Sequence, residues 1–112
     1  MTRIYVPATR ELLAAWHDAG QVPADAVAEA FEAPDETEEG EYAALMSAAD
    51  ISAEMLAGPG RRIVVVLEAD YAPVDWAEVV AVHADPADRP AGADPDEDLA
   101  WFTTQEVPDL LR

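Results

Sequence analysis

His83 and Asp85 are the residues whose types and spacing best suit chemistry in this sequence. His83 falls in a predicted strand two residues before Asp85, an arrangement that could orient the imidazole as a general base. Glu106 could add a carboxylate, and Tyr42 and Trp101 could shape the site with aromatic surface. The candidate binding residues are therefore Tyr42, His83, Asp85, Trp101, Gln105 and Glu106, and no catalytic residue can be assigned. A surface or hydrogen-bonded histidine is the more common situation, so that alternative stays open.

Metal ligands are the second chemistry to consider, because Asp94, Asp96 and Asp98 alternate as the first ligands of a calcium loop do. The rest of that pattern fails. Leu99 stands where the loop needs glycine, and Gln105 stands where it needs a bidentate glutamate. The chain has no cysteine, and neither of its two histidines belongs to a spaced ligand set. The sequence predicts no metal site and no cofactor.

Sequence motifs for nucleotide binding and nucleophilic catalysis also fail. A nucleotide-binding fold would place glycines after the first strand, where this chain has PATR. No serine lies in a nucleophile elbow. With 24 acidic residues, the abundance of carboxylates is no evidence for a catalytic pair. The sequence therefore favours a protein without enzymatic activity, while a small enzyme or small-molecule binder stays open.

The formal charge of −18 at pH 7 restricts the partners of this chain. An acidic surface repels nucleic-acid phosphates and anionic membranes, because binding to them depends on basic side chains. The same field attracts a basic protein, at a rate that salt lowers. We therefore expect a basic protein partner, no direct nucleic-acid binding and no membrane binding. Three alternatives stay open: a homo-oligomer, a mimic of nucleic-acid charge, and charge that serves solubility alone.

The N-terminal segment MTRIYVPATREL predicts a cytoplasmic protein. It lacks the basic start and apolar core of a secretory signal, and no apolar run in the chain reaches the length of a membrane span. The absence of cysteine fits a reducing compartment. A length of 112 residues with 51% hydrophobic residues predicts one folded domain.

The elements that must position the candidate residues are five strands and two main helices. Thr9 and Thr37 are predicted N-caps of the helices, which end at Gly20 and before Gly58. The expected helices therefore cover residues 10–19 and about 38–57, and the expected strands are 3–8, 25–34, 63–67, 79–84 and 99–104. A single helical turn is expected after Asp75, and a terminal turn at 107–111.

Two of these segments differ in how clearly their residue pattern predicts a strand. Residues 63–67 are apolar without interruption, which predicts a central strand buried on both faces. Residues 26–32 are ambiguous, because alternation favours a strand whereas the alanines favour a helix. We predict a strand there, since Pro23 and Pro34 leave little room for a helix.

Strands joined by helices prefer right-handed parallel crossovers. The predicted architecture is therefore an α/β two-layer sandwich, with a mixed sheet of about five strands and two main helices. Residues 85–98 contain three prolines, one glycine and six acids, and are expected to form a mobile surface loop.

The segment that begins at Leu99, LAWFTTQEVPDLLR, places aromatic residues on both faces of its predicted strand. Trp101 would face one side and Phe102 the other, so a core strand is the favoured interpretation. The alternative is a tail that docks on a partner through Trp101 or through Leu110 and Leu111.

Four sequence blocks carry a resemblance to a known family: RIYVPAT, EYAAL, AVHAD and AWFTTQEVPDLL. The chain resembles an uncharacterised family of short actinobacterial proteins, known only as a domain of unknown function. The resemblance implies a cytoplasmic actinobacterial protein and carries over no catalytic residue. Together, these observations favour a non-enzymatic protein-binding or regulatory module.

Overall fold

The computed structural model describes residues 3–112, which form a five-stranded sheet in the order β3-β1-β4-β6-β7. Its strands are β1 (Arg3–Ala8), β3 (Phe31–Glu32), β4 (Ile63–Glu68), β6 (Val79–Ala84) and β7 (Ala100–Phe102). A two-stranded sheet pairs β2 (Gln21–Val22) with β5 (Val74–Asp75). The helices are α1 (Arg10–Ala19), α2 (Ala24–Ala28), α3 (Glu38–Met55) and α4 (Val107–Leu110), and the 3-10 turns are η1 (Trp76–Glu78) and η2 (Thr104–Glu106).

The two long helices begin and end where their capping residues predict. The Thr9 hydroxyl accepts a hydrogen bond from the backbone amide of Leu12, and the Thr37 hydroxyl accepts one from the backbone amide of Gly40. Each threonine thus provides an acceptor for a first-turn amide that has no carbonyl partner within its helix. Gly20 ends α1 with a φ of 75°, in the left-handed region that glycine adopts readily. The α/β class, a main sheet of five strands and the two main helices are confirmed.

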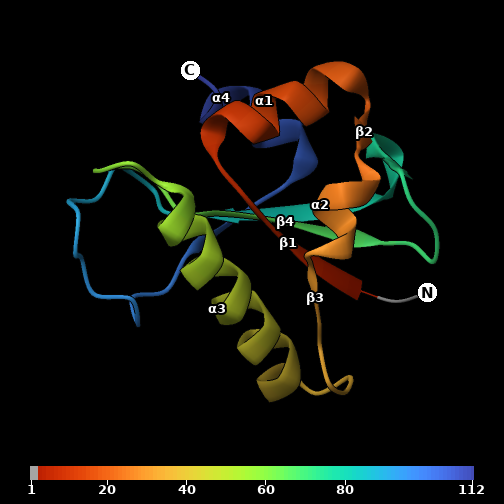
Figure 1. The fold of residues 1–112 in the computed structure, drawn as a ribbon, viewed down its shortest axis with the longest axis horizontal. Helices are drawn as coiled ribbons and strands as arrows, with labels where there is room; N and C mark the ends of the chain where they lie inside the picture. Colours follow the sequence, from red (N-terminus) through yellow and green to blue (C-terminus); the bar gives the residue numbers. More distant parts are fainter. Residues whose placement is uncertain (1–2) are drawn as a thin grey trace.

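Helices cover both faces of the sheet, so the fold has three layers instead of the predicted two (Figure 1). Residues of β4 alternate between two cores, which is why the whole run from Ile63 to Leu67 is buried. The core on one face, here called the α1-side core, includes Leu13 of α1, Val65 of β4 and Leu110 of α4. The core on the other face, the α3-side core, includes Ala48 of α3 and Val64 of β4.

Strand directions also differ from the expectation, because every pair of neighbouring strands is antiparallel. The connection through α3 nevertheless joins two strands that run in the same direction. Both β3 and β4 run antiparallel to β1, so they share one direction, but β1 lies between them. The sheet is therefore not mixed, although it contains the predicted parallel crossover between strands that are not neighbours.

Residues 25–34 form a short helix followed by a two-residue strand, so the prediction of one strand there is wrong. The helix α2 begins after Pro23, whose carbonyl accepts a hydrogen bond from Val27. The alanines of this segment favour the helical turn. Only Phe31 and Glu32 then extend along β1 at the edge of the sheet.

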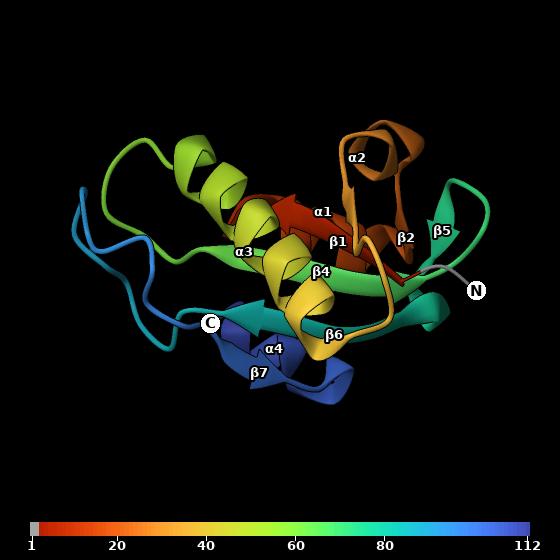
Figure 2. The same ribbon diagram turned by 90° about the horizontal axis from the view of Figure 1, so that it is seen from below.

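The strand β7 is shorter than predicted and lies at the opposite edge of the sheet (Figure 2). Trp101 is 59% exposed there, so the prediction that it completes the core is wrong. Phe102 packs partly buried against the α1-side core, and Val107 and Leu110 beyond it are buried. The C-terminal segment does complete the core, but through these residues. No helix among residues 3–112 is long and apolar enough to cross a membrane.

Candidate functional site

Trp101 and His83 lie opposite each other on the neighbouring strands β7 and β6. His83 is in turn paired with Val64 of β4, whose side chain belongs to the α3-side core. Directly opposed residues of antiparallel strands share one face of a sheet. The imidazole and the indole therefore lie on the face that carries α3, but at the sheet edge, where Trp101 is exposed.

Tyr42 reaches the same edge from α3. Its side chain is 49% exposed, and its hydroxyl donates a hydrogen bond of 2.7 Å to a carboxylate oxygen of Asp98. Asp98 is followed by Leu99, which packs partly buried against the α3-side core just before β7 begins. Three of the predicted residues, Tyr42, His83 and Trp101, thus come from separate elements to one side of the sheet. We call this group the Trp101 face.

His83 presents a neutral imidazole on this face. The side chain is half-buried, and burial lowers the pKa of His83 below its usual value, because the protonated ring loses solvation. Within residues 3–112 its side chain makes no hydrogen bond or ion pair, so no carboxylate orients it. The structure therefore does not assemble the predicted general base.

Asp85 is committed to a buried ion pair instead. The side chains of Asp85 and Arg62 are 2% and 3% exposed, and Arg62 Nε and Nη2 donate hydrogen bonds of 3.0 and 2.8 Å to the two carboxylate oxygens. The backbone amide of Arg62 adds a third hydrogen bond of 2.9 Å. Burial raises the pKa of Asp85, but the hydrogen bonds and charge of Arg62 outweigh it and hold the pKa below its usual value.

Arg62 and Arg89 attach the segment 85–98, predicted to be a mobile loop, to the body of the protein. Arg62 donates to the carbonyls of Pro95 and Glu97, at 3.1 and 2.7 Å. Arg89 lies 3.5 Å from Asp85 and pairs its backbone with Gly60 in both directions. These contacts anchor the segment at several points, while its mobility stays a prediction.

Gln105 and Glu106 lie apart from the Trp101 face. Glu106 accepts hydrogen bonds of 3.0 Å from both the amide and the hydroxyl of Thr103, which forms a capping box at η2. The following α4 packs on the α1-side core, on the other face of the sheet from His83. Glu106 thus stabilises its own turn, and Gln105 is exposed beside it.

Two of the alternating aspartates, Asp94 and Asp98, accept hydrogen bonds within the protein. Asp94 accepts a hydrogen bond of 2.9 Å from the amide of Asp96, and Asp98 is bound by Tyr42. Among the described residues, no group of three or more histidine, aspartate or glutamate side chains is placed to hold a metal ion.

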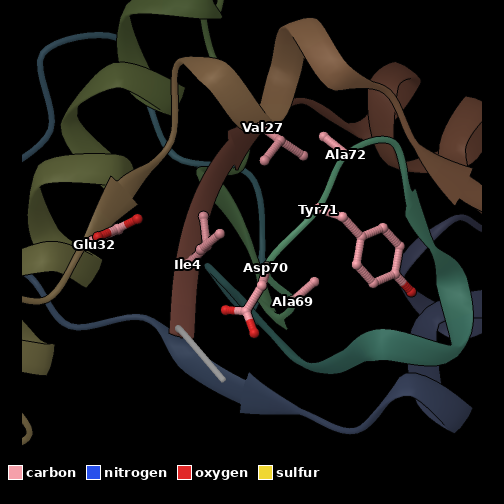
Figure 3. A pocket seen from close by; sticks show the side chains of 7 residues that line it. All are labelled: Ile4, Val27, Glu32, Ala69, Asp70, Tyr71 and Ala72. Carbon is pink, nitrogen blue, oxygen red and sulfur yellow. The ribbon is translucent and has the colours of Figure 1, made fainter.

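A separate hollow of about 350 Å³ opens on the α1 side of the sheet, between α2 and the start of β1 (Figure 3). Ile4, Val27 and Ala69 supply apolar surface, and Glu32 and Asp70 supply carboxylates. No motif in the sequence signals this hollow, because its residues come from four segments.

The Trp101 face combines aromatic and polar side chains. It offers an exposed indole, a neutral imidazole and a phenol at a sheet edge, whereas the carboxylates predicted to act with His83 are committed to Arg62 and to Thr103. Arg62, which holds Asp85 and the segment 85–98, was not among the residues predicted from the sequence.

Comparisons with known proteins agree with the sequence resemblance. A search of curated proteins and a search of solved structures each found no match. A family model does match, and it covers residues 2–111, which is nearly the whole chain. The chain therefore belongs to DUF6912, a family of unknown function.

Proposed function

We propose that this protein is a non-enzymatic binding module that docks a basic protein on the Trp101 face. The observation that carries the proposal is the exposure of Trp101 on an edge strand. Large aromatic side chains are costly to expose in quantity and are enriched among the residues that dominate protein interfaces. An indole that is 59% exposed is therefore a candidate anchor.

The backbone of β7 supports the same proposal. It pairs with β6 on one side, and it is the last strand of the five-stranded sheet. Unpaired amides and carbonyls at a sheet edge can accept another strand. A partner segment that extends along β7 would gain backbone hydrogen bonds, while the Trp101 side chain contacts its apolar residues.

Charge selects the class of partner. Asp94, Asp96, Glu97 and Asp98 are all exposed in the segment that leads into β7, and the whole chain carries −18. His83 adds no positive charge at neutral pH, because burial lowers its pKa. A second copy of this acidic chain would be repelled, so a basic partner is favoured over self-association.

Immobilised protein tests the proposal by retention of partners from the cytoplasm of the source cell at low and high salt. We expect wild-type protein to retain a basic protein at low salt, and to lose it as salt screens the charges. Trp101→Ala should fail to retain it even at low salt. Leu12→Ala is the matched control, since Leu12 is an exposed apolar residue on α1, at the other face.

Two outcomes contradict the proposal. Retention that does not weaken with salt would remove the electrostatic part, and equal retention by Trp101→Ala and Leu12→Ala would remove the Trp101 face. Competition by DNA for the retained protein would identify the partner as a nucleic-acid-binding protein and support the charge-mimic hypothesis. Equal competition by an unstructured polyacid would remove that specificity.

A further inference from the structure

We propose that His83 makes docking at the Trp101 face depend on pH, so that the face binds a basic segment while the imidazole is neutral and releases it when the ring is protonated. This regulation rests on the proposed function, because it acts on the same face. The position of His83 carries it, since the residue lies directly opposite Trp101 across β6 and β7. The Cβ atoms of such opposed residues lie about 4.5–5.5 Å apart, so a charge on the imidazole acts on whatever docks against the indole.

The strands around His83 provide no counterion for a protonated imidazole. On β4 it is paired with Val64, and two positions before it in β6 is Ala81, which belongs to the α3-side core. Two positions after it, Asp85 is bound to Arg62 through both carboxylate oxygens. Burial alone lowers the pKa of His83, and no charge among residues 3–112 contributes to the shift. A proton on this ring therefore adds positive charge that its neighbours do not neutralise.

Tyr42 and Asp98 are the titratable groups that reach the face from α3 and from the segment before β7. The Tyr42 hydroxyl donates a hydrogen bond of 2.7 Å to Asp98, and this bond is the main cause that raises the pKa of Tyr42 above its usual value. The phenol therefore stays neutral in the range where histidine titrates. Glu41, next to Tyr42 in α3, pairs with Arg3 at 3.4 Å. His83 is thus the group of this face whose charge responds to mild acidification.

A docked basic segment disfavours the protonated form of His83 in two ways. It covers a half-buried imidazole, which removes solvent from the ring, and it brings positive charge beside it. Binding and protonation are therefore linked, and each weakens the other by the same factor. If the pKa of His83 decreases by about one in the complex, the protein with a protonated His83 binds the segment about tenfold more weakly.

Titration of the folded protein with the acetylated and amidated peptide Lys-Val-Lys-Val-Lys-Val, at about pH 7.5 and about pH 5, tests this regulation. The peptide is basic and alternates as a strand does, so it suits the free edge of β7. We expect the affinity of wild type to fall by up to about tenfold at the lower pH. His83→Gln should lose most of this decrease and keep only the part that is due to carboxylates. His17→Gln is the matched control, because it removes the other histidine, on α1 at the opposite face, and should keep the wild-type decrease.

The imidazole signals of His83 in wild type give a second measurement, which needs no variant to fold. The pKa of His83 should decrease when the protein is saturated with the peptide, while that of His17 stays constant. Trp101→Ala separates this regulation from the docking itself. Binding that does not depend on Trp101 at either pH would overturn the proposed function and the regulation with it. Binding that depends on Trp101, but with the same pH dependence in wild type and His83→Gln or with an unchanged pKa of His83, would overturn the regulation alone.

Discussion

Asp85→Asn should destabilise the fold strongly, although it changes a single atom. The Asp85 carboxylate accepts three hydrogen bonds from Arg62 and faces Arg89, in surroundings where its side chain is only 2% exposed. Breaking a buried ion pair by removing one charge costs about 3–5 kcal/mol, since the remaining charge stays buried. A typical domain is stable by roughly 5–15 kcal/mol, so this loss is a large fraction of the total.

Thermal and urea unfolding measure this loss. For a domain of this size each kcal/mol shifts Tm by roughly 4 °C, so we expect a decrease of about 12–20 °C. Asp88→Asn is the matched control, because Asp88 is an exposed acid of the same loop and should change stability by less than about 0.5 kcal/mol. The explanation fails if the two variants unfold within about 1 kcal/mol of each other.

The pH dependence supplies a second check on the same pair. The pKa of Asp85 is lower in the folded state than in the unfolded chain, where it lies near 3.8. The stabilisation is therefore present above about pH 3.8 and is lost as the pH falls through the folded-state pKa. The difference between wild type and Asp85→Asn should accordingly shrink in acid, whereas a constant difference would point to packing alone.

Two further predictions concern the half-buried His83 and the buried Ser52. Burial lowers the pKa of His83 in the folded state, so the neutral imidazole contributes its full stability above about pH 6.5 and loses it as the pH falls toward the folded-state pKa. The unfolding free energy of His83→Gln should therefore depend less on pH between 7 and 5 than that of wild type. An identical pH dependence of the two proteins would contradict this explanation. Ser52→Ala should cost about 1–3 kcal/mol, because the buried Ser52 hydroxyl donates to the Ala8 carbonyl at 2.7 Å and accepts from the Ile63 amide at 2.8 Å. Ser47→Ala on the exposed side of α3 is its control, and equal unfolding free energies would contradict the assigned role of Ser52.

Local signals in the sequence predicted the long elements well. Thr9 and Thr37 specify where α1 and α3 begin, because each caps its own first turn. The apolar run that starts at Ile63 identified the central strand, since a strand with both faces covered needs apolar residues throughout. The family resemblance is likewise confirmed, whereas actinobacterial origin and cytoplasmic location stay predictions.

Features that depend on distant parts of the chain were not predictable. Trp101 is exposed because β7 is an edge strand. The sequence of residues 99–104 carries no local signal that its strand lies at the edge of the sheet. The carboxylate of Asp85 is bound by Arg62 and is therefore not available to His83, and Arg62 lies 23 positions earlier in the chain. The hollow needs α2, β1, β3 and the turn after β4 together, and residues 26–32 were themselves ambiguous.

The most direct test of the Trp101 face is to measure folding and partner retention on the same sample of Trp101→Ala. Because most of the indole surface is exposed, we expect the variant to melt within a few degrees of wild type and to lose the basic partner that wild type retains at low salt. A decrease in stability of about 3–5 kcal/mol, as for a buried tryptophan, would show that Trp101 belongs to the core. Undiminished retention of the partner by a stably folded Trp101→Ala would show that the protein binds elsewhere.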